Sequence, residues 1–427
     1  MCRRHSSIGA FSITESTAAR FQEKDTAVGL SRQDQKVDRG SVSPQQRSYV
    51  LTMREAASAP EAATATNTKT DVAGPIRWNI ADEVTQLREW GTGIAHPLSR
   101  EHGPLLLGAA QDCWLRLWDP SGRISRKHAV LSHEESGWTI SDLESKNGVH
   151  LDGVRVASAV LAPGTEIRVG PVTLIAESPK LIALRALLER LLGWGEDRRE
   201  EVDQALFSVR VAATHREPLL LCGAGNLVPI ARQLHQHILG DTPFILSRPR
   251  TAHARGVDAL AAATGGTLCI WRHQQPDDFD EVVSALRGPF ARALLVVCAH
   301  ALPRGNDIAS QIVTVVRSIL IPPLADRAQE LHRIVDEYAA EAKEAFHGGW
   351  MAPADREWVA NNASGSLHQL GMATRRIVAL HACGESVTQA SKLLRMSHGS
   401  LSDWLARRTL PGRPMPYEDD DDGIDDR

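Results

Sequence analysis

The stretch SRKHAVLSHEESGWTISDLESKNGVHLDGVRV, residues 125–156, decides the fold of the region around it. Apolar residues alternate with polar ones, and clusters of Ser, Gly, Asn and Asp interrupt the alternation at short intervals. Similar runs lie on both sides, from PLLLGAA near residue 105 to VTLIAES near residue 177. Short alternating strands separated by closely spaced turns predict an antiparallel β-sandwich over about 105–177.

Three blocks of this stretch resemble the signature of the forkhead-associated (FHA) family. They are residues 125–129 (SRKHA), 142–148 (DLESKNG) and 151–153 (LDG), and residues 161–170 (LAPGTEIRVG) resemble the family's closing strands. The resemblance implies a β-sandwich in which the loops at one end bind a phosphothreonine peptide.

The resemblance also implies a role for individual residues. Ser125 and Arg126 match loop residues that contact the phosphate, Asn147 matches the residue that holds the peptide backbone, and His128 matches a residue that braces the loop from inside. A phosphate dianion needs charged, hydroxyl or amide donors on rigid loops, and these residue types can supply them. The predicted phosphopeptide-binding set is Ser125, Arg126, Lys127, Asn147 and Gly148, and the predicted structural set is Gly108, His128 and Asp142.

Two positions depart from the family pattern. The family's early Gly-Arg pair, whose arginine contacts the phosphate, reads Gly108-Ala109 here, and the second asparagine of the usual pattern is Asp152. A charged hydrogen bond contributes about 1.5–3 kcal/mol, so its loss lowers affinity by one to two decades. The candidates for compensation are Arg116, Arg123 and Lys127. The alternative is an FHA fold that has lost phosphate binding and serves as a docking surface.

The composition indicates an ordinary cytoplasmic protein of several domains. The chain has 427 residues, 42% hydrophobic residues and a formal net charge of −4, so contact with nucleic acid would need a local basic patch. Six cysteines without CxxC spacing argue against a zinc module or a disulfide framework and fit a reducing compartment. We expect no signal peptide and no membrane-spanning segment. Met53 is an alternative first residue, so the start of the chain stays open.

Residues 179–384 resemble the AAA+ domain of bacterial NtrC-like (sigma-54-dependent) activators. Apolar strands such as PLLLC and ALLVVCAH alternate there with helical segments. This α/β pattern predicts a parallel sheet. The matches occur in the family's order, at residues 218–235, 264–270, 293–299, 321–327 and 365–370.

The positions that perform chemistry in that family have changed in this sequence. No Lys-Ser/Thr pair follows Gly225, as a P-loop requires, and Trp271 and Arg272 replace the Walker B acids. His368 stands at the position of the family's sensor arginine. The segment between Pro243 and Thr264 is too short for the family's loop that binds the sigma factor. We therefore expect a pseudo-ATPase that is not an enzyme, with no catalytic residue, no cofactor and no metal. The surviving Arg327 is expected in a salt bridge or at the surface, and Cys222, Cys269 and Cys298 in the core.

Residues 385–405 resemble the Fis-type helix-turn-helix that ends such activators. The first helix is expected over about 388–394, and Ser397 is a natural N-cap for the second. The spacing of apolar residues predicts a small core between the helices, formed by Ala390, Leu393, Leu394, Leu401, Trp404 and Leu405. The predicted DNA-binding residues are Lys392, Arg395, Ser397, His398, Ser400, Ser402 and Arg407. Asp403 and the acidic tail YEDDDDGIDDR oppose such binding.

The predicted organisation has five parts: a disordered region at 1–74, an FHA domain with its leading segment at 75–178, a degenerate AAA+-like domain at 179–384, a helix-turn-helix at 385–410 and a disordered acidic tail at 411–427. We expect a phosphothreonine-responsive transcription regulator that binds a phosphorylated protein and DNA. The alternative is an FHA adaptor in Ser/Thr-kinase signalling that does not bind DNA. Whether the chain forms homo-oligomers stays open.

Overall fold

The computed structural model describes residues 82–247, 255–286, 293–301 and 317–408. The predicted disorder of 1–74 and 411–427 lies outside these ranges, as does part of the segment between Pro243 and Thr264. Within the described ranges, every helix is too short or too polar to cross a membrane.

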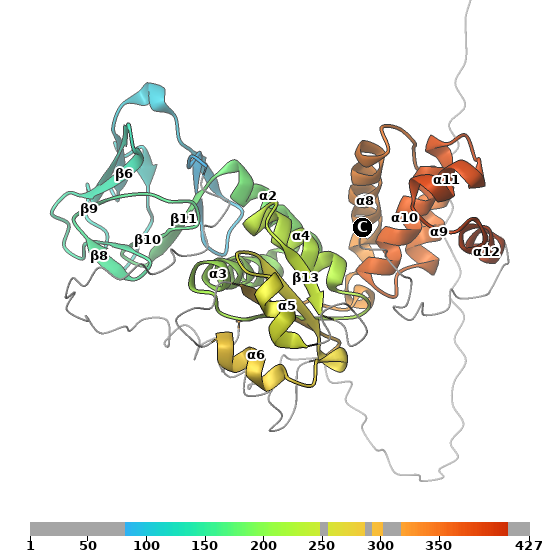
Figure 1. The fold of residues 1–427 in the computed structure, drawn as a ribbon. Helices are drawn as coiled ribbons and strands as arrows, with labels where there is room; N and C mark the ends of the chain where they lie inside the picture. Colours follow the sequence, from blue (N-terminus) through green and yellow to red (C-terminus); the bar gives the residue numbers. More distant parts are fainter. Residues whose placement is uncertain (1–81, 248–254, 287–292, 302–316, 409–427) are drawn as a thin grey trace, which may run out of the picture. The chain divides into compact units, whose positions relative to one another are not determined.

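Residues 86–177 form two sheets that pack into a β-sandwich (Figure 1). The first sheet, in the order β2-β1-β11-β10-β7-β8, contains β1 (Gln86–Glu89), β2 (Ala95–Pro97), β7 (Val149–Leu151), β8 (Val154–Val156), β10 (Glu166–Val169) and β11 (Val172–Glu177). The second, in the order β4-β3-β5-β6-β9, contains β3 (Leu105–Gly108), β4 (Leu115–Arg116), β5 (Ala129–Glu134), β6 (Gly137–Asp142) and β9 (Ser158–Val160). The predicted sandwich is confirmed.

Two details of the sandwich differ from the prediction. It begins at Gln86 rather than near 105, because β1 pairs with β11 and extends the first sheet. The sequence of β1, QLRE, contains a buried arginine and so hides the alternation that identifies a strand. The short strands β3 and β4 pair in parallel, whereas the other strand pairs of the sandwich are antiparallel.

Alternation explains how the sandwich builds its core. One face of each sheet supplies residues that are completely buried, among them Leu87, Leu107, Leu131, Ile140 and Ile167. The hairpin β7–β8 turns through Asp152 and Gly153, which both have positive φ values of 48° and 86°. Asp-Gly is the sequence that such a two-residue turn favours.

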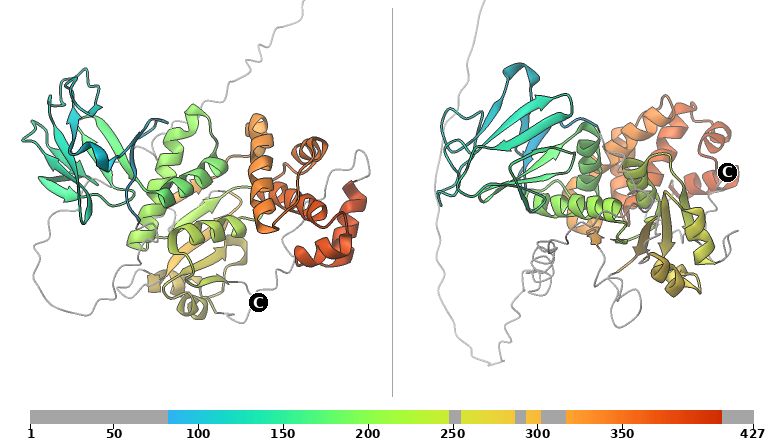
Figure 2. Two further views of the ribbon diagram at one scale, coloured as in Figure 1. Left: turned by 90° about the horizontal axis from the view of Figure 1, so that it is seen from above. Right: turned by 60° about the vertical axis from the view of Figure 1, so that its left-hand side comes forward.

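Residues 219–320 contain a parallel five-stranded sheet in the order β13-β14-β15-β12-β16, which confirms the predicted parallel arrangement. Its strands are β12 (Leu219–Cys222), β13 (Phe244–Ser247), β14 (Thr267–Trp271), β15 (Leu294–Ala299) and β16 (Arg317–Leu320). Alternate residues pack against helices on opposite faces (Figures 1 and 2). One face contacts α2 (Pro179–Leu192), α3 (Arg199–His215) and α4 (Val228–Leu239), and the other contacts α5 (Gly256–Ala262) and α6 (Phe279–Leu286).

The helix that begins at Pro179 is interrupted in the stretch GEDRREEVDQ. Ser178 caps α2 by accepting a hydrogen bond from the Leu181 N–H, and α2 ends at Leu192 before Gly193, which has φ 122°. A short 3₁₀ turn (Glu196–Arg198) then leads into α3.

The C-terminal part of the described chain is helical. A 3₁₀ segment (Leu324–Glu330) leads to α8 (Leu331–Ala345), α9 (Pro353–Asn362), α10 (Leu367–Ala382), α11 (Val387–Leu393) and α12 (His398–Arg408). Ala390, Leu401 and Trp404 are buried as predicted, and Leu394 and Leu405 are partly buried. The prediction for Leu393 was wrong, because its side chain is 39% exposed.

A buried ion cluster joins the first sheet to the helices that follow it. Arg88 on β1 donates from Nε to Glu177 on β11 at 2.7 Å, and its two terminal nitrogens donate to Asp203 on α3 at 3.0 and 2.5 Å. All three residues are at most 1% exposed. Burial disfavours the charge on Arg88, but hydrogen bonds and attraction from Asp203 and Glu177 outweigh it and raise its pKa.

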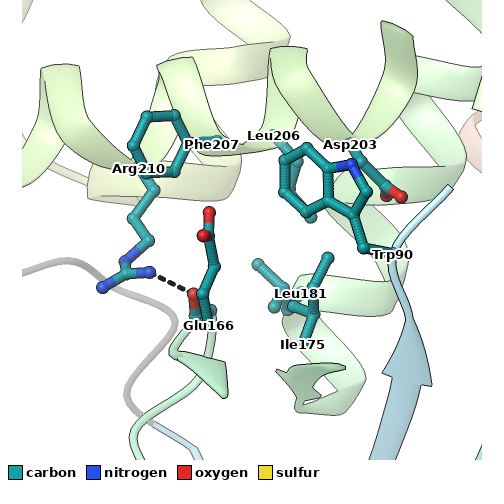
Figure 3. Close-up of a pocket in the computed structure, with 9 residues that line it drawn as sticks. Trp90, Glu166, Ile175, Leu181, Asp203, Leu206, Phe207 and Arg210 are labelled. Atoms are coloured by element: carbon teal, nitrogen blue, oxygen red, sulfur yellow. Dashed lines mark hydrogen bonds between the residues drawn. The ribbon is translucent and has the colours of Figure 1, made fainter. Parts of the chain in front are cut away.

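A second ion pair and a small cavity lie beside this cluster, and Figure 3 shows the cavity. Arg210 on α3 pairs with Asp152 in the β7–β8 turn at 2.5 Å and donates to the Gly164 carbonyl. The cavity, lined by Trp90, Ile175 and Phe207 among others, has a volume of about 10 Å³. That is room for about one water molecule, so the cavity is a packing feature rather than a ligand site.

We predict that Arg88→Ala lowers the free energy of unfolding by about 3–5 kcal/mol, because it leaves Asp203 buried without its counter-charge and leaves Glu177 with Arg185 as its remaining cation. Thermal and urea unfolding of the full chain would measure this loss. Arg100→Ala, which breaks the exposed pair with Glu83, is the matched control and should cost under about 1 kcal/mol. Equal losses for the two variants would contradict a special role for the buried cluster.

Candidate functional site

Three loops meet at one end of the sandwich, and together they contain all the predicted phosphopeptide-binding residues. They are residues 109–114 after β3, residues 117–128 between β4 and β5, and residues 143–148 between β6 and β7. The first two loops are joined by backbone hydrogen bonds from Ala109 to Ser125 and from Ala110 to Arg126, both at 3.0 Å. These bonds hold the loop that carries Ser125 and Arg126 against the end of β3.

Gly108 makes this close approach possible. A Cβ at this position would collide with the carbonyl oxygen of Arg126 and would lie 2.9 Å from that of Ser125. Both obstacles are backbone atoms, so no side-chain rotation could relieve the collision. Only glycine fits between β3 and the Ser125 loop, which is a physical reason for its place in the motif.

His128 joins the second loop to the third. Its side chain is fully buried; Nδ1 accepts a hydrogen bond from the Ser125 N–H at 3.1 Å, and Nε2 lies 3.2 Å from the Gly148 carbonyl. Since Nδ1 is an acceptor, the proton must be on Nε2, where it is donated to Gly148. The ring is therefore a neutral brace rather than a ligand for phosphate.

Asp142 and Ser145 organise the third loop. Asp142 accepts hydrogen bonds from the Ser145 hydroxyl at 2.5 Å and the Ser145 N–H at 3.2 Å. The Ser145 hydroxyl oxygen in turn accepts from the Gly148 N–H at 2.9 Å. Gly148 is thus held by Ser145 through its N–H and by His128 through its carbonyl. Ser145, which is buried, was not among the predicted site residues; its position three residues after Asp142 was the available signal.

Ser125 and Asn147 are held from opposite loops. The Ser125 hydroxyl oxygen accepts from the Lys146 N–H at 3.2 Å, which leaves its proton available to donate. The Asn147 side chain donates to the Arg123 carbonyl at 2.6 Å, which ties the third loop to the second.

The cations around the loops differ in their availability. Lys127 forms an ion pair with Asp112 at 3.4 Å, and Nε of Arg123 donates to Ser121 at 2.8 Å. The exposed side chains of Arg116 and Arg126 form no hydrogen bond or ion pair with any residue that the structure describes. Arg116 lies directly beside Gly108 in the parallel β3–β4 pair.

The loop after β12 occupies the position that the sequence comparison assigned to a phosphate-binding loop. Gly225 packs against Ser366, the N-cap of α10, so that a Cβ on Gly225 would lie 2.5 Å from the Ser366 Cβ. Gly223 packs in the same way against Ile321. Trp271 is buried and contacts the rings of His273 and His300. Gly223, Gly225 and Trp271 thus all pack closely against other described residues at this end of the sheet.

Arg327 and the three predicted core cysteines are buried in the protein interior. Arg327 is 2% exposed; it forms a salt bridge with Glu330 at 2.7 Å and donates to the carbonyls of Arg190 and Leu191 at the end of α2. Cys222, Cys269 and Cys298 are buried as predicted. Burial raises the pKa of Cys222 to about 11, so it is a thiol at neutral pH.

The second helix of the predicted helix-turn-helix begins as expected. The Ser397 hydroxyl accepts from the Ser400 N–H at 3.0 Å. Lys392, Arg395, His398 and Ser400 are exposed, and Ser402 is partly buried. Arg407 donates to the Asp403 carbonyl one turn earlier. The next residue, Arg408, forms an ion pair with Asp355.

Comparison with known proteins identifies one part of the chain. Residues 105–170 match the model of the FHA domain family. A curated relative, the FHA domain-containing protein FhaB of Mycobacterium tuberculosis, is 42% identical over 80 residues, which is 18% of this chain and 49% of that protein. FhaB of Mycolicibacterium smegmatis is 43% identical over 68 residues, or 16% of this chain and 43% of that protein. The chain thus spans about half the length of the curated relatives it matches.

Solved structures match the same region. One, from a study of phosphothreonine-dependent FHA domain interactions, is 29% identical and covers 22% of this chain and 94% of its own, with a TM-score of 0.20. Another, the FhaA FHA domain complexed with the intracellular domain of Rv3910, is 30% identical and covers 21% and 96%, with a TM-score of 0.19. On the evidence of the family model, the chain contains an FHA domain.

Proposed function

We propose that this protein binds phosphothreonine peptides through the three loops of its FHA domain. The observation that carries the proposal is the position of Ser125, whose backbone is held by His128 and whose hydroxyl oxygen is held by Lys146. The hydroxyl proton is then available to be donated to a phosphate oxygen. A donor that is already in place loses little entropy on binding.

We propose that Arg116 contacts the phosphate in place of the family's arginine, which is Ala109 in this chain. Side chains at paired positions of neighbouring strands project from the same face of a sheet, so Arg116 projects from the face on which the Ser125–Arg126 backbone crosses Gly108. Its neighbours Leu115 and Leu117 are buried, which fixes Arg116 on the opposite, exposed face. Lys127 and Arg123 are weaker candidates, because both already have partners.

The α/β part of the chain acts by binding rather than by hydrolysis. Support for this comes from the packing of Gly225 onto Ser366 and of Gly223 onto Ile321, where a phosphate-binding loop would need open space. No lysine follows this loop, and Trp271 fills the position of an acid. We propose a degenerate AAA+-like domain that serves as a scaffold.

DNA binding by α11 and α12 is a second candidate function, which would make the protein a cytoplasmic transcription regulator. It is favoured by the Ser397-capped α12 and by the exposed side chains of Lys392, Arg395 and His398 near its start. The engagement of Arg407 and Arg408 within the protein leaves few cations for phosphates. If the surface does not bind DNA, the protein is an adaptor in Ser/Thr-kinase signalling.

We predict that calorimetry with a phosphothreonine peptide library finds binders that lose affinity when the phosphate is removed. Ser125→Ala should weaken binding about tenfold, and Arg116→Ala about tenfold to a hundredfold, because each removes a hydrogen bond to a charged group. Ala109→Arg supplies the family's arginine and serves as a second probe. It should restore Arg116→Ala but add little to wild type.

Two outcomes would contradict parts of this proposal. If wild type binds no phosphopeptide and Ala109→Arg creates binding, the domain has lost its ligand. If Arg116→Ala binds as wild type does, Arg116 is not the compensating residue.

We predict that ATP with magnesium at millimolar concentration shifts the melting temperature of the chain by less than about 1 °C. The stabilisation by a ligand depends on the ratio of its concentration to its Kd. A chain that does not bind ATP at this concentration therefore shows no shift in melting temperature. Differential scanning fluorimetry measures this, and a clear concentration-dependent shift would refute the scaffold role.

We predict that, if the helix-turn-helix binds DNA, Lys392→Ala with Arg395→Ala weakens binding at all sequences. The slope of log affinity against log salt should fall by about 2, one for each phosphate contact that is lost. Mobility-shift assays over a salt series would measure both. Absence of any shift with genomic fragments would leave the adaptor function.

A further inference from the structure

Three basic side chains form a row across the outer face of the first sheet, which we call the basic row: Arg155 on β8, His150 on β7 and Arg168 on β10. His150 is the direct cross-strand partner of both arginines. The next residues along these strands, Val149, Ile167 and Val169, are completely buried in the sandwich. The basic row therefore projects from the opposite face, and both arginines are exposed.

The rest of this face is already occupied. One row further from the loops, Ile175 packs into the core formed with α2 and α3, and Asp152 pairs with Arg210 of α3. Glu166 on the same row lines the cavity against α3 (Figure 3). The basic row is consequently the part of the face between the covered region and the three loops.

The basic row has no neutralising partner among the described residues. None of its members forms an ion pair with a described carboxylate. The charged groups facing His150 are Arg155 from β8 and Arg168 from β10, and burial together with these two cations lowers the pKa of His150. Concentrated, unpaired positive charge of this kind attracts acidic groups.

The basic row is continuous with the loops of the FHA site. Arg155 lies against Gly148, so that a Cβ on Gly148 would lie 2.9 Å from the Arg155 Cζ. Gly148 follows Asn147 directly and is held by His128 and Ser145. A peptide that binds at Asn147 and continues over Gly148 would reach Arg155 first, then His150 and Arg168.

We propose that the basic row binds acidic side chains that flank the phosphothreonine of the partner, so that the protein selects phosphothreonine segments with neighbouring Asp or Glu residues. The proposal rests on the function proposed above. It extends the recognised segment from the phosphorylated residue to several residues on one side of it.

The test compares two phosphothreonine peptides taken from a binder, one with Asp at the flanking positions and one with Asn. For wild type the Asp peptide should bind about threefold to tenfold more tightly at low salt, and the preference should shrink as ionic strength rises. Arg155→Ser with Arg168→Ser should abolish this preference while it leaves binding of the Asn peptide within about twofold. Arg333→Ser with Lys343→Ser on α8 removes the same charge elsewhere and should keep the preference.

His150 gives a second readout. An acidic side chain beside it favours the protonated ring, so binding raises its lowered pKa and takes up a proton. The preference for the Asp peptide should therefore increase as pH falls from 7 to 6 in wild type and stay constant in His150→Gln. Taking the ratio of the two peptides removes the titration of the phosphate itself, which both share.

The outcomes separate the two proposals. If neither peptide binds, the phosphothreonine function fails. If both bind equally, or if Arg155→Ser with Arg168→Ser keeps the preference, the basic row is not a recognition surface. If the full chain shows no preference but a chain without residues 411–427 does, the acidic tail of the chain occupies the basic row. That result would also overturn the proposal.

Discussion

The buried charge cluster of Arg88, Glu177 and Asp203 is the constraint on which the arrangement around the sandwich depends. Burying an arginine and two carboxylates is costly unless each charge is paired and hydrogen-bonded, and here Arg88 satisfies both acids at once. The three residues come from β1, β11 and α3, so the cluster can form only when α3 lies on the first sheet. Part of the outer face of the first sheet, which would otherwise meet water, becomes an internal surface.

This coverage determines what the FHA domain can present to a partner. With α2 and α3 over part of the first sheet, the loops and the basic row beside them remain as a continuous exposed surface. The loops themselves are fixed by bonds that do not involve a ligand: Gly108 admits the Ser125 backbone, His128 ties Ser125 to Gly148, and Asn147 reaches the Arg123 carbonyl. Such a site is organised before a peptide arrives, and the proposed binding needs little rearrangement.

At the strand ends of the α/β sheet, residues that could contact a ligand pack against other parts of the chain. The two glycines after β12, Gly223 and Gly225, allow close packing against Ile321 and Ser366. Arg327 is likewise used internally, where it holds the last carbonyls of α2. In the helical part, Arg408 is held by Asp355, which reduces the charge that α12 can offer to DNA. Residues whose types suggest ligand binding are thus part of the packing.

The local pattern of the sequence determined the FHA sandwich, its three loops, the parallel sheet, and the Ser397 cap, because alternation, turn residues and capping act over a few neighbouring residues. Contacts between distant residues were decided only by the tertiary structure. Arg88 and Asp203 are 115 positions apart, and no local sequence pattern near either residue predicts the pair.

The partners of the cations near the three loops were likewise decided by the tertiary structure. The sequence left Arg116, Arg123 and Lys127 equivalent, whereas strand pairing places Arg116 beside Gly108 and gives the other two local partners. Leu393 met the helical spacing of a core residue but is exposed, because burial depends on which face a neighbouring helix covers.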